Sequence, residues 1–265
     1  MKKSVLNCLF VLLIPVILSS NTVLSLQKST QFVMFSSHDK WKKMFNEDVA
    51  SIHSLYSEHA VVIVENDTVC VGKEQINKLY QTLKLKWNAI DTVYTNYEKI
   101  DFVSAFVTYE IGTFITSDGE QYNHLIVWDK HNNSIKRELE VIYKKEVDTD
   151  AGDIVKKQRE NWVRMANKHD VEAFLRTVFC DNSVYYWNSK NELYTGIFEI
   201  KDAYGYMADT NWSITDLQPL YMKQVHDSLI YEIGKYLSGG YVGCYTLVWK
   251  KNKKNEWKVF LDSNY

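Results

Sequence analysis

The chain has 265 residues, of which 46% are hydrophobic and 14% aromatic, and its formal net charge is −2. This length and composition allow one or two packed domains. The small net charge argues against a general nucleic-acid-binding surface, which needs a basic excess, so we expect no nucleic-acid partner.

Residues 1–25 have the composition of a secretory signal peptide. Two lysines precede an apolar run from Val5 to Leu18, and small polar residues follow. The run is shorter than the roughly 20 apolar residues of a membrane-spanning helix. The sequence therefore predicts a secreted or periplasmic protein with no stable membrane span after cleavage, which we expect before Leu26.

The first predicted domain covers residues 38–146 and begins with helices. Helical spacing of apolar residues indicates one or two helices between Trp41 and Tyr56, with Asp48 as the cap of the second. A strand at 60–64, a turn, a strand at 69–71 and a helix at 73–83 are expected next. Four β segments then follow, at 93–100, 104–116, 121–130 and 135–144, and turn residues between the last three favour antiparallel hairpins.

A short acidic linker at 147–153 leads into the second predicted domain, which covers residues 154–265 in the same order. Its expected helices are 154–166, 171–179 and 198–207, with a short strand at 184–187. Its expected long strands are 213–220, 228–237, 241–250 and 256–263, with Pro219 at a strand end.

The two predicted domains are copies of one unit. The sequence Tyr-Glu-Ile-Gly occurs at 109–112 and again at 231–234, 122 positions later. Other anchors recur in the same order at nearly the same offset, namely Trp41 and Trp162, Asp48 and Asp170, Gly72 and Gly196, Tyr80 and Tyr204, and Trp128 and Trp249. A colinear series over this length indicates a domain duplication.

Helices followed by long strands in each copy predict the α+β class. We expect two tandem cone-shaped domains, each a curved antiparallel sheet wrapped over about three N-terminal helices. We also expect the two copies to form an intramolecular pseudo-dimer.

This order of elements resembles the nuclear-transport-factor-two-like superfamily, whose fold is also called the cystatin-like cone, and within it the SnoaL-like domains. The residues that carry the resemblance are Asn46–Val49 before Leu55-Tyr56, Ala60-Val61, Gly72–Ile76, Lys168–Val171 before Phe179, Gly196–Ile200 and Trp257–Val259. The resemblance covers nearly all of residues 38–265. It implies the fold but no single activity, because the same cone is similar to those of ketosteroid isomerase, scytalone dehydratase, polyketide cyclases and non-catalytic binding modules.

An isomerase of this fold would place a carboxylate base on the first strand and an acid on the third long strand. The base position falls near Val64 in the first copy and Trp187 in the second, and neither side chain accepts a proton. The acid position falls near His124 and Tyr245, which are able to donate. Because the pair is incomplete, we do not carry the isomerase activity over.

His124 is the best single titratable candidate. Strict strand alternation places it on one face with Tyr122, Ile126 and Trp128. If that face lines the cone, His124 lies in an aromatic pocket where burial lowers its pKa. We favour an ordinary core or surface histidine. The alternative is a lyase, isomerase or cyclase acting in the first cone, with His124 as proton donor or shuttle.

Glu110 and Glu232 occupy the same place in the repeat and alternate with Tyr and Ile. If Tyr and Ile form the core face, both glutamates point outward; if the glutamate face lines the cone, both are buried with a raised pKa. We favour the outward orientation. The same logic applies to Glu140 and Asp262.

The abundance of Tyr and Trp fits a pocket for an apolar or ring-shaped ligand. We favour a protein that is not an enzyme and that binds a small apolar or aromatic molecule in a cone, or that binds a protein through its sheets. The candidate pocket residues are Tyr122, His124, Trp128, Trp187 and Tyr245.

The histidines and cysteines have no metal-ligand spacing and no phosphate loop occurs, so we expect no metal and no cofactor. Three cysteines, Cys70, Cys180 and Cys244, remain after signal cleavage. Cys180 and Cys244 could pair, although we favour free thiols.

Overall fold

The computed structural model describes residues 37–100, 107–131, 134–147 and 149–264. The predicted signal peptide at 1–25 lies outside these residues. Among the residues described, none of the helices is both long enough and apolar enough to span a membrane.

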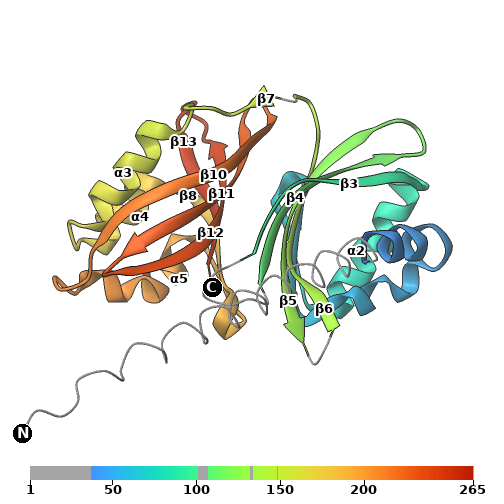
Figure 1. Cartoon of the computed structure of the whole chain (residues 1–265), viewed down its shortest axis with the longest axis horizontal. Coiled ribbons are helices and arrows are strands. Elements are labelled where there is room, and N and C mark those ends of the chain that lie inside the picture. Colours follow the sequence, from blue (N-terminus) through green and yellow to red (C-terminus); the bar gives the residue numbers. More distant parts are fainter. Residues whose placement is uncertain (1–36, 101–106, 132–133, 148, 265) are drawn as a thin grey trace, which may run out of the picture.

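Strands in each half of the chain form one sheet, and the two sheets face each other (Figure 1). The first sheet consists of β1 (Tyr56–Val64), β2 (Thr68–Val71), β3 (Ile90–Ile100), β4 (Thr108–Thr116), β5 (Gln121–His131) and β6 (Ser134–Lys144). The second consists of β7 (Thr149–Asp150), β8 (Phe179–Trp187), β9 (Glu192–Thr195), β10 (Ile214–His226), β11 (Leu229–Ser238), β12 (Tyr241–Lys251) and β13 (Trp257–Asn264).

The strand orders are β2-β1-β6-β5-β4-β3 and β7-β10-β11-β12-β13-β8-β9. The long strands pair antiparallel as predicted. The first strand of each copy instead joins the last strand in parallel, as β1 with β6 and β8 with β13. Each sheet is therefore mixed, and the same exception in both halves reflects the duplication.

Helices cover the outer side of each sheet (Figure 1). In the first half these are a helix at 37–47, the 3-10 turns η1 (Val49–Leu55) and η2 (Glu65–Asp67), and α2 (Gly72–Trp87). In the second half they are α3 (Lys156–Ala166), α4 (Val171–Val178), η3 (Asn188–Lys190), α5 (Gly196–Ala203) and η4 (Gly205–Ala208). This confirms the predicted α+β class with two tandem cones.

Repeated glycines begin the third helix of each copy. Gly72 and Gly196 have φ values of +74° and +73°, a region that favours glycine, at the turn from a short strand into α2 and α5. The repeat anchor at these positions is thus a backbone requirement.

Pro219 lies inside β10, and not at a strand end as predicted. The register between β10 and β11 shifts between Pro219 and Tyr221, and β7 pairs with β10 only at Lys223 and Gln224. Pro219 therefore occupies an irregular position on an unpaired edge, where the missing N–H leaves no ladder bond unmade.

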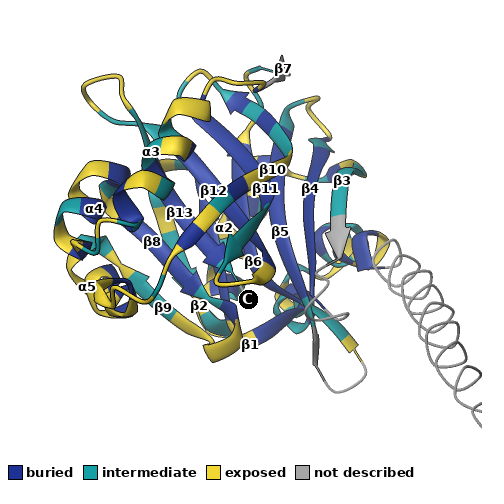
Figure 2. Cartoon of the chain, turned by 60° about the vertical axis from the view of Figure 1, so that its left-hand side comes forward, coloured by how far each residue is buried: buried dark blue, intermediate teal, exposed yellow. Residues whose placement is uncertain are grey.

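The inner faces of the two sheets form a shared hydrophobic core. It contains side chains from both halves, including Val61, Ile111, Leu125, Val141, Tyr186, Ile233, Val248 and Leu261. Tyr231 donates its hydroxyl hydrogen across the interface to the carbonyl oxygen of Val141 at 3.1 Å, and Tyr97 stacks on Tyr221 with ring centroids 4.8 Å apart. Figure 2 shows the central strands buried and the exposed residues concentrated in helices and loops.

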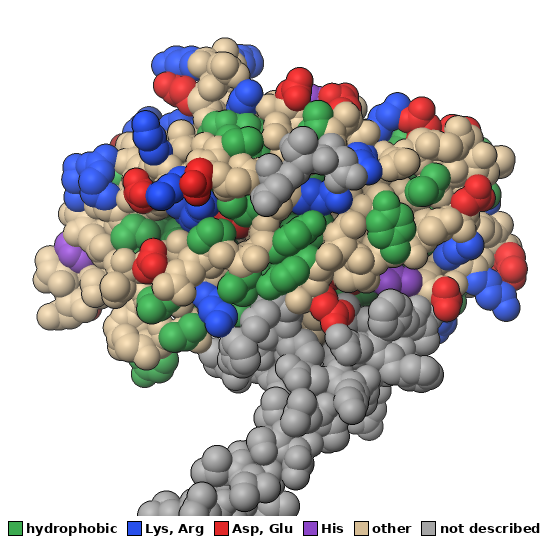
Figure 3. All heavy atoms as spheres, turned by 45° about the horizontal axis from the view of Figure 1, so that its top comes forward, with side chains coloured by type: hydrophobic (Ala, Val, Ile, Leu, Met, Phe, Trp, Pro, Cys, Tyr) green, Lys and Arg blue, Asp and Glu red, His purple; other side chains and the backbone are tan. Residues whose placement is uncertain are grey.

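Cys70, Cys180 and Cys244 form no disulfide bond within the described residues, in line with the interpretation favoured from the sequence, and Cys244 is buried in the shared core. On the face shown in Figure 3, basic and acidic side chains are interspersed with hydrophobic ones.

Candidate functional site

The repeated glutamates Glu110 and Glu232 are buried, with no solvent-exposed surface. The indole Nε1 of Trp128 donates to Oε2 of Glu110 at 2.7 Å, and Trp249 makes the same bond to Glu232 at 2.7 Å. The favoured outward orientation was wrong. It assumed that one face of each sheet is open, whereas the tyrosine face packs against the other sheet and the glutamate face against the helices.

A basic side chain from the first helix of each copy lies beside each glutamate. Nε2 of His38 lies 2.8 Å from Oε1 of Glu110, and Nη1 of Arg159 in α3 lies 3.3 Å from Oε2 of Glu232. Burial raises the pKa of Glu110, but His38, His124 and the hydroxyl group of Thr95 together more than offset this and bring the pKa to about 2. Burial prevails for Glu232, whose pKa is raised despite Arg159. Sequence reasoning missed His38 and Arg159, although they stand 121 positions apart, as do Trp41 and Trp162.

The second pair of repeated acids, Glu140 and Asp262, is also buried rather than outward-facing. Tyr80 in α2 donates its hydroxyl hydrogen to Oε2 of Glu140 at 2.8 Å. Tyr204, which directly follows α5, donates to Asp262 in the same way. Each cone thus contains a buried acid that accepts a hydrogen bond from a tyrosine hydroxyl group.

The cones differ in the charge beside this acid. Nη1 of Arg137 donates to Oε1 of Glu140 at 2.6 Å. Arg137 pairs with Trp128 in the register of the first sheet, and Val259 pairs with Trp249 at the same point of the second. Burial raises the pKa of Glu140, but Arg137, with His124 and the hydroxyl group of Tyr56, more than offsets this and brings the pKa to about 2. The first cone thus has a cation beside this acid, at a position where the second cone has a valine.

His124 lies inside the first cone with no exposed surface. Its Nδ1 is 3.1 Å from Oε1 of Glu140, so it has the second titratable group that an acid–base role requires. Burial lowers the pKa of His124 and favours the neutral ring. Trp41 and Phe114, both fully buried, pack against the ring with centroids 6.2 and 5.7 Å away. A substrate has no surface of His124 to contact.

Tyr122 and Trp128, the other first-cone residues of the predicted pocket, are also packed in the core. Tyr122 stacks on Phe114 with ring centroids 5.1 Å apart, and Trp128 is held by Glu110. Tyr122, His124 and Trp128 do lie on one strand face, the face toward the helices, as alternation predicted.

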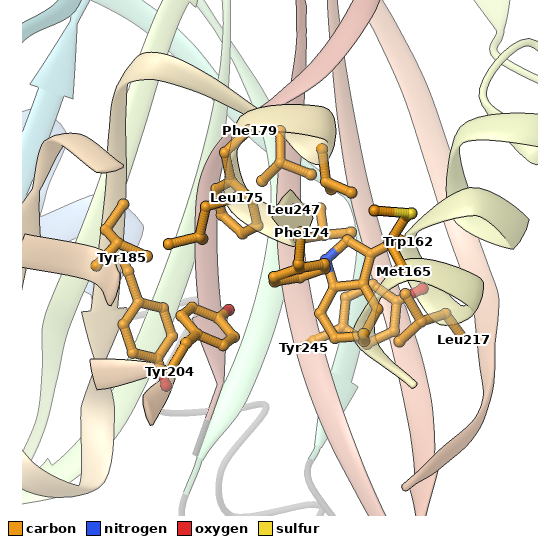
Figure 4. Packing of buried hydrophobic residues seen from close by; sticks show 14 of the residues in the cluster. Trp162, Met165, Phe174, Leu175, Phe179, Tyr185, Tyr204, Leu217, Tyr245 and Leu247 are labelled. Carbon is orange, nitrogen blue, oxygen red and sulfur yellow. The ribbon is translucent and has the colours of Figure 1, made fainter. Parts of the chain in front are cut away.

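The second cone contains a cavity of about 430 Å³. Trp187 and Tyr245, the second-cone residues of the predicted pocket, line it. The other lining residues are mostly aromatic or apolar: Trp162, Tyr185, Tyr204, Tyr206, Trp212, Ile214, Leu217, Tyr236, Ser238, Tyr241, Leu247, Asp262 and Asn264. Figure 4 shows Tyr185 and Tyr204 side by side, with ring centroids 4.8 Å apart. Tyr241 is 79% exposed, so the cavity reaches the surface.

Asp262 is the acidic side chain of this cavity. Burial raises its pKa to about 7, and the hydrogen bond from Tyr204 offsets only part of that rise. Within the described residues, no group of three or more metal-ligating side chains is arranged to hold a metal ion. The cavity therefore offers aromatic walls and one carboxyl group that titrates near neutral pH.

No protein-family profile and no curated protein matches the chain. Solved structures that resemble it include a domain of unknown function with a cystatin-like fold from Nostoc punctiforme, 15% identical over 44% of this chain and 78% of the other, with a TM-score of 0.39. A hexachlorocyclohexane dehydrochlorinase LinA-type3 from Novosphingobium barchaimii is 12% identical over 45% and 88%, with a TM-score of 0.37. A ketosteroid isomerase-like protein from Erwinia carotovora atroseptica is 13% identical over 42% and 93%, with a TM-score of 0.35.

The first of these structures is described as having a cystatin-like fold, the fold to which the sequence resemblance pointed. Likenesses at this level say nothing about activity. The fold itself is established by the strand order and the helices of the chain.

Proposed function

We propose that this chain of two tandem cystatin-like cones binds a small, largely apolar or aromatic molecule in its second cone. The observation that carries the proposal is the aromatic cavity of about 430 Å³ with Asp262 in its wall. Small-molecule sites are typically concave, mostly apolar, roughly 300–1,000 Å³ in volume and equipped with a few polar groups. The second cone has each of these properties.

The proposal is for binding without chemistry. Tyr204, the hydrogen-bond partner of Asp262, keeps its proton because burial raises its pKa well above the ordinary value. The geometry therefore assigns a substrate no complementary base beside Asp262. Catalysis in the first cone through His124 lacks support, since its ring is enclosed. Protein binding through the inner sheet faces also lacks support, because they cover each other.

A thermal-shift screen with steroids, quinones and aromatic polyketides tests the proposal. A ligand at 100 times its Kd stabilises the folded state by about 2.7 kcal/mol, which is readily measured as a rise in Tm. We expect at least one of these ring compounds to raise the Tm of the wild-type protein.

Variants at the cavity mouth locate the binding site. Tyr241→Ala and Tyr206→Ala remove rings that line the cavity, so each is expected to weaken binding by about 0.5–1.5 kcal/mol. Phe198→Ala is the matched control, because Phe198 is 79% exposed like Tyr241 but lies on α5 outside the cavity lining. Absence of any shift, or equal weakening by Phe198→Ala, contradicts binding in the second cone.

We also propose that the protein is secreted or periplasmic, on the strength of the pattern in residues 1–25. N-terminal sequencing of the exported protein is expected to begin at Leu26. Recovery of the whole chain with Met1 from the cell interior contradicts this.

A further inference from the structure

In the first cone, the guanidinium group of Arg137 packs against aromatic rings of the same cone. The guanidinium carbon of Arg137 lies 4.7 Å from the centroid of the Trp41 ring and 5.0 Å from that of Trp128. Its Nη1 donates to Glu140 at 2.6 Å. The buried acid of this cone is thus neutralised by a cation that aromatic faces attract.

The second cone keeps the acid and the rings but has no such cation. Asp262 takes the place of Glu140, and Val259 stands at the register position of Arg137. Trp162, the repeat counterpart of Trp41, lines the cavity together with Asp262. The hydrogen bond that the structure gives Asp262 comes from the phenol of Tyr204, a neutral donor.

Arg159 does not supply the missing charge to Asp262. Its guanidinium is bound to Glu232, whose counterpart Glu110 is likewise bound by His38 in the first cone. Within the described part of the chain, the ion pairs include none to Asp262. The difference between the cones is therefore specific to one acid.

We propose that the second-cone cavity takes an organic cation, an ammonium or guanidinium group carried on an apolar or aromatic body. Asp262 would be the counter-ion of this ligand. The aromatic walls would contact both the charged group and the apolar body of the ligand. The ligand would then supply the charge that Arg137 supplies inside the first cone. This inference rests on the proposed function, since it names the chemical class of the ligand for the same cavity.

The electrostatics of Asp262 agree with this assignment. Its pKa is raised to about 7 by burial, as expected for an acid without a counter-ion, whereas that of Glu140 is about 2 beside Arg137. A bound cation favours the ionised carboxyl group, so binding and loss of the proton are linked.

The test uses two probes of nearly the same shape, phenyltrimethylammonium and its uncharged isostere tert-butylbenzene, titrated calorimetrically into the full-length protein. The cation is expected to bind at least about tenfold more tightly, as a desolvated aromatic cage with a carboxylate favours charge. Asp262→Asn keeps the shape of the side chain and an acceptor for Tyr204, and is expected to remove this preference.

The pH dependence of wild-type binding needs no variant. The probe is permanently charged, so its protonation does not change. Among the described residues, the titratable groups whose charge interacts with Asp262 include the phenols of Tyr185, Tyr204, Tyr206 and Tyr245, whose pKa values are all raised. Because only the ionised form of Asp262 binds the cation, the affinity for the cation is expected to rise about 30-fold from pH 5.5 to pH 8.

Each outcome decides the point. Tighter binding of the cation, lost in Asp262→Asn and rising with pH, supports the proposal. Equal or tighter binding of tert-butylbenzene, or affinity for the cation that does not change with pH, overturns the cation while leaving an apolar ligand site in place. If neither probe binds, the proposal of a cationic ligand is contradicted. The thermal-shift screen with ring compounds then tests the proposed function separately.

Discussion

A ring lies directly over a glycine in each cone. A Cβ atom added to Gly234 would stand 2.3 Å from the Tyr245 ring, and one added to Gly112 would stand 2.3 Å from Nε2 of His124. Tyr245 then donates its hydroxyl hydrogen to Oε1 of Glu232 at 2.6 Å. The repeated Tyr-Glu-Ile-Gly sequence is explained at this scale, because the glutamate anchors buried donors and the glycine makes room for the ring.

Gly234→Ala is expected to destabilise the protein by about 1–3 kcal/mol, because the added methyl group displaces a packed ring. Urea unfolding measures the change. Gly205→Ala is the control, since nothing lies within 4 Å of a Cβ added at Gly205 and its φ is not in the left-handed region. Equal midpoints for both variants would show that the ring position is not constrained by the glycine.

Asp262 makes stability depend on pH in the direction opposite to Glu110 and Glu140. Its folded-state pKa of about 7 lies above the ordinary 3.8, so the folded protein holds this proton more tightly than the unfolded chain. The resulting stability is fully present below about pH 4 and is lost as the pH rises toward 7. For Glu110 and Glu140, with pKa values of about 2, stability is present above about pH 4.5 and lost below it.

Asp262→Asn is expected to abolish the part of the decrease in stability between pH 4 and pH 8 that is due to Asp262. Relative to wild type, the variant should gain up to about 4 kcal/mol over that range, one pKa unit corresponding to about 1.4 kcal/mol. Chemical denaturation at both pH values measures the difference between variant and wild type, in which all other titrating groups cancel. A difference that does not change with pH would contradict the raised pKa.

The second helical segment of each copy shows how one local bond selects an element. Asp48-Val49 and Asp170-Val171 are the same anchor of the repeat. Oδ1 of Asp170 accepts a hydrogen bond from the backbone N–H of Ala173 at 3.0 Å and α4 forms, whereas Asp48 makes no capping bond and η1 is a 3-10 helix. Asp48 therefore stands at the predicted N-cap position of η1, but its side chain makes no cap hydrogen bond, whereas that of Asp170 does so in the other copy.

Asp170→Ala is expected to cost about 1 kcal/mol of unfolding free energy, the usual effect of losing an N-terminal cap. Asp48→Ala is the matched variant and should cost clearly less, because no cap is lost. Urea midpoints of the two variants give the comparison. A larger cost at Asp48 would reverse this assignment.

At the scale of the molecule, the shared core joins the two cones. The hydroxyl group of Tyr231 bonds to backbone oxygens of the other sheet, and Tyr109 donates to the carbonyl oxygen of Cys244 at 3.4 Å. We propose that this arrangement is an intramolecular pseudo-dimer, in which each cone covers the sheet face of the other. Exposing either face would leave a large apolar surface in water.

The protein is therefore expected to unfold in one transition and to be monomeric by light scattering. Cooperative burial across the shared core couples the halves, so tryptophan fluorescence and far-ultraviolet circular dichroism should give coincident urea curves. Two separated transitions would show that the cones are stable independently of each other.

Much of the fold followed from the sequence alone, because it depends on local patterns. Alternation and turn residues placed the long strands, and the repeat placed the same elements in both halves. The predicted strand at 121–130, for example, is β5 at Gln121–His131. The aromatic content predicted a pocket, and two of the residues proposed for it, Trp187 and Tyr245, line the cavity of the second cone.

Which cone holds an aromatic cavity beside a buried acid was decided only by the tertiary structure. One substitution between the copies, Arg137 against Val259, places a cation beside Glu140 in the first cone, while the second has an aromatic cavity beside Asp262. Alternation tells which side chains share a face of a strand, but not what covers that face. Because both faces of both sheets are covered, the acids that alternation left ambiguous are all buried, and only three-dimensional packing shows which of them has a cation beside it.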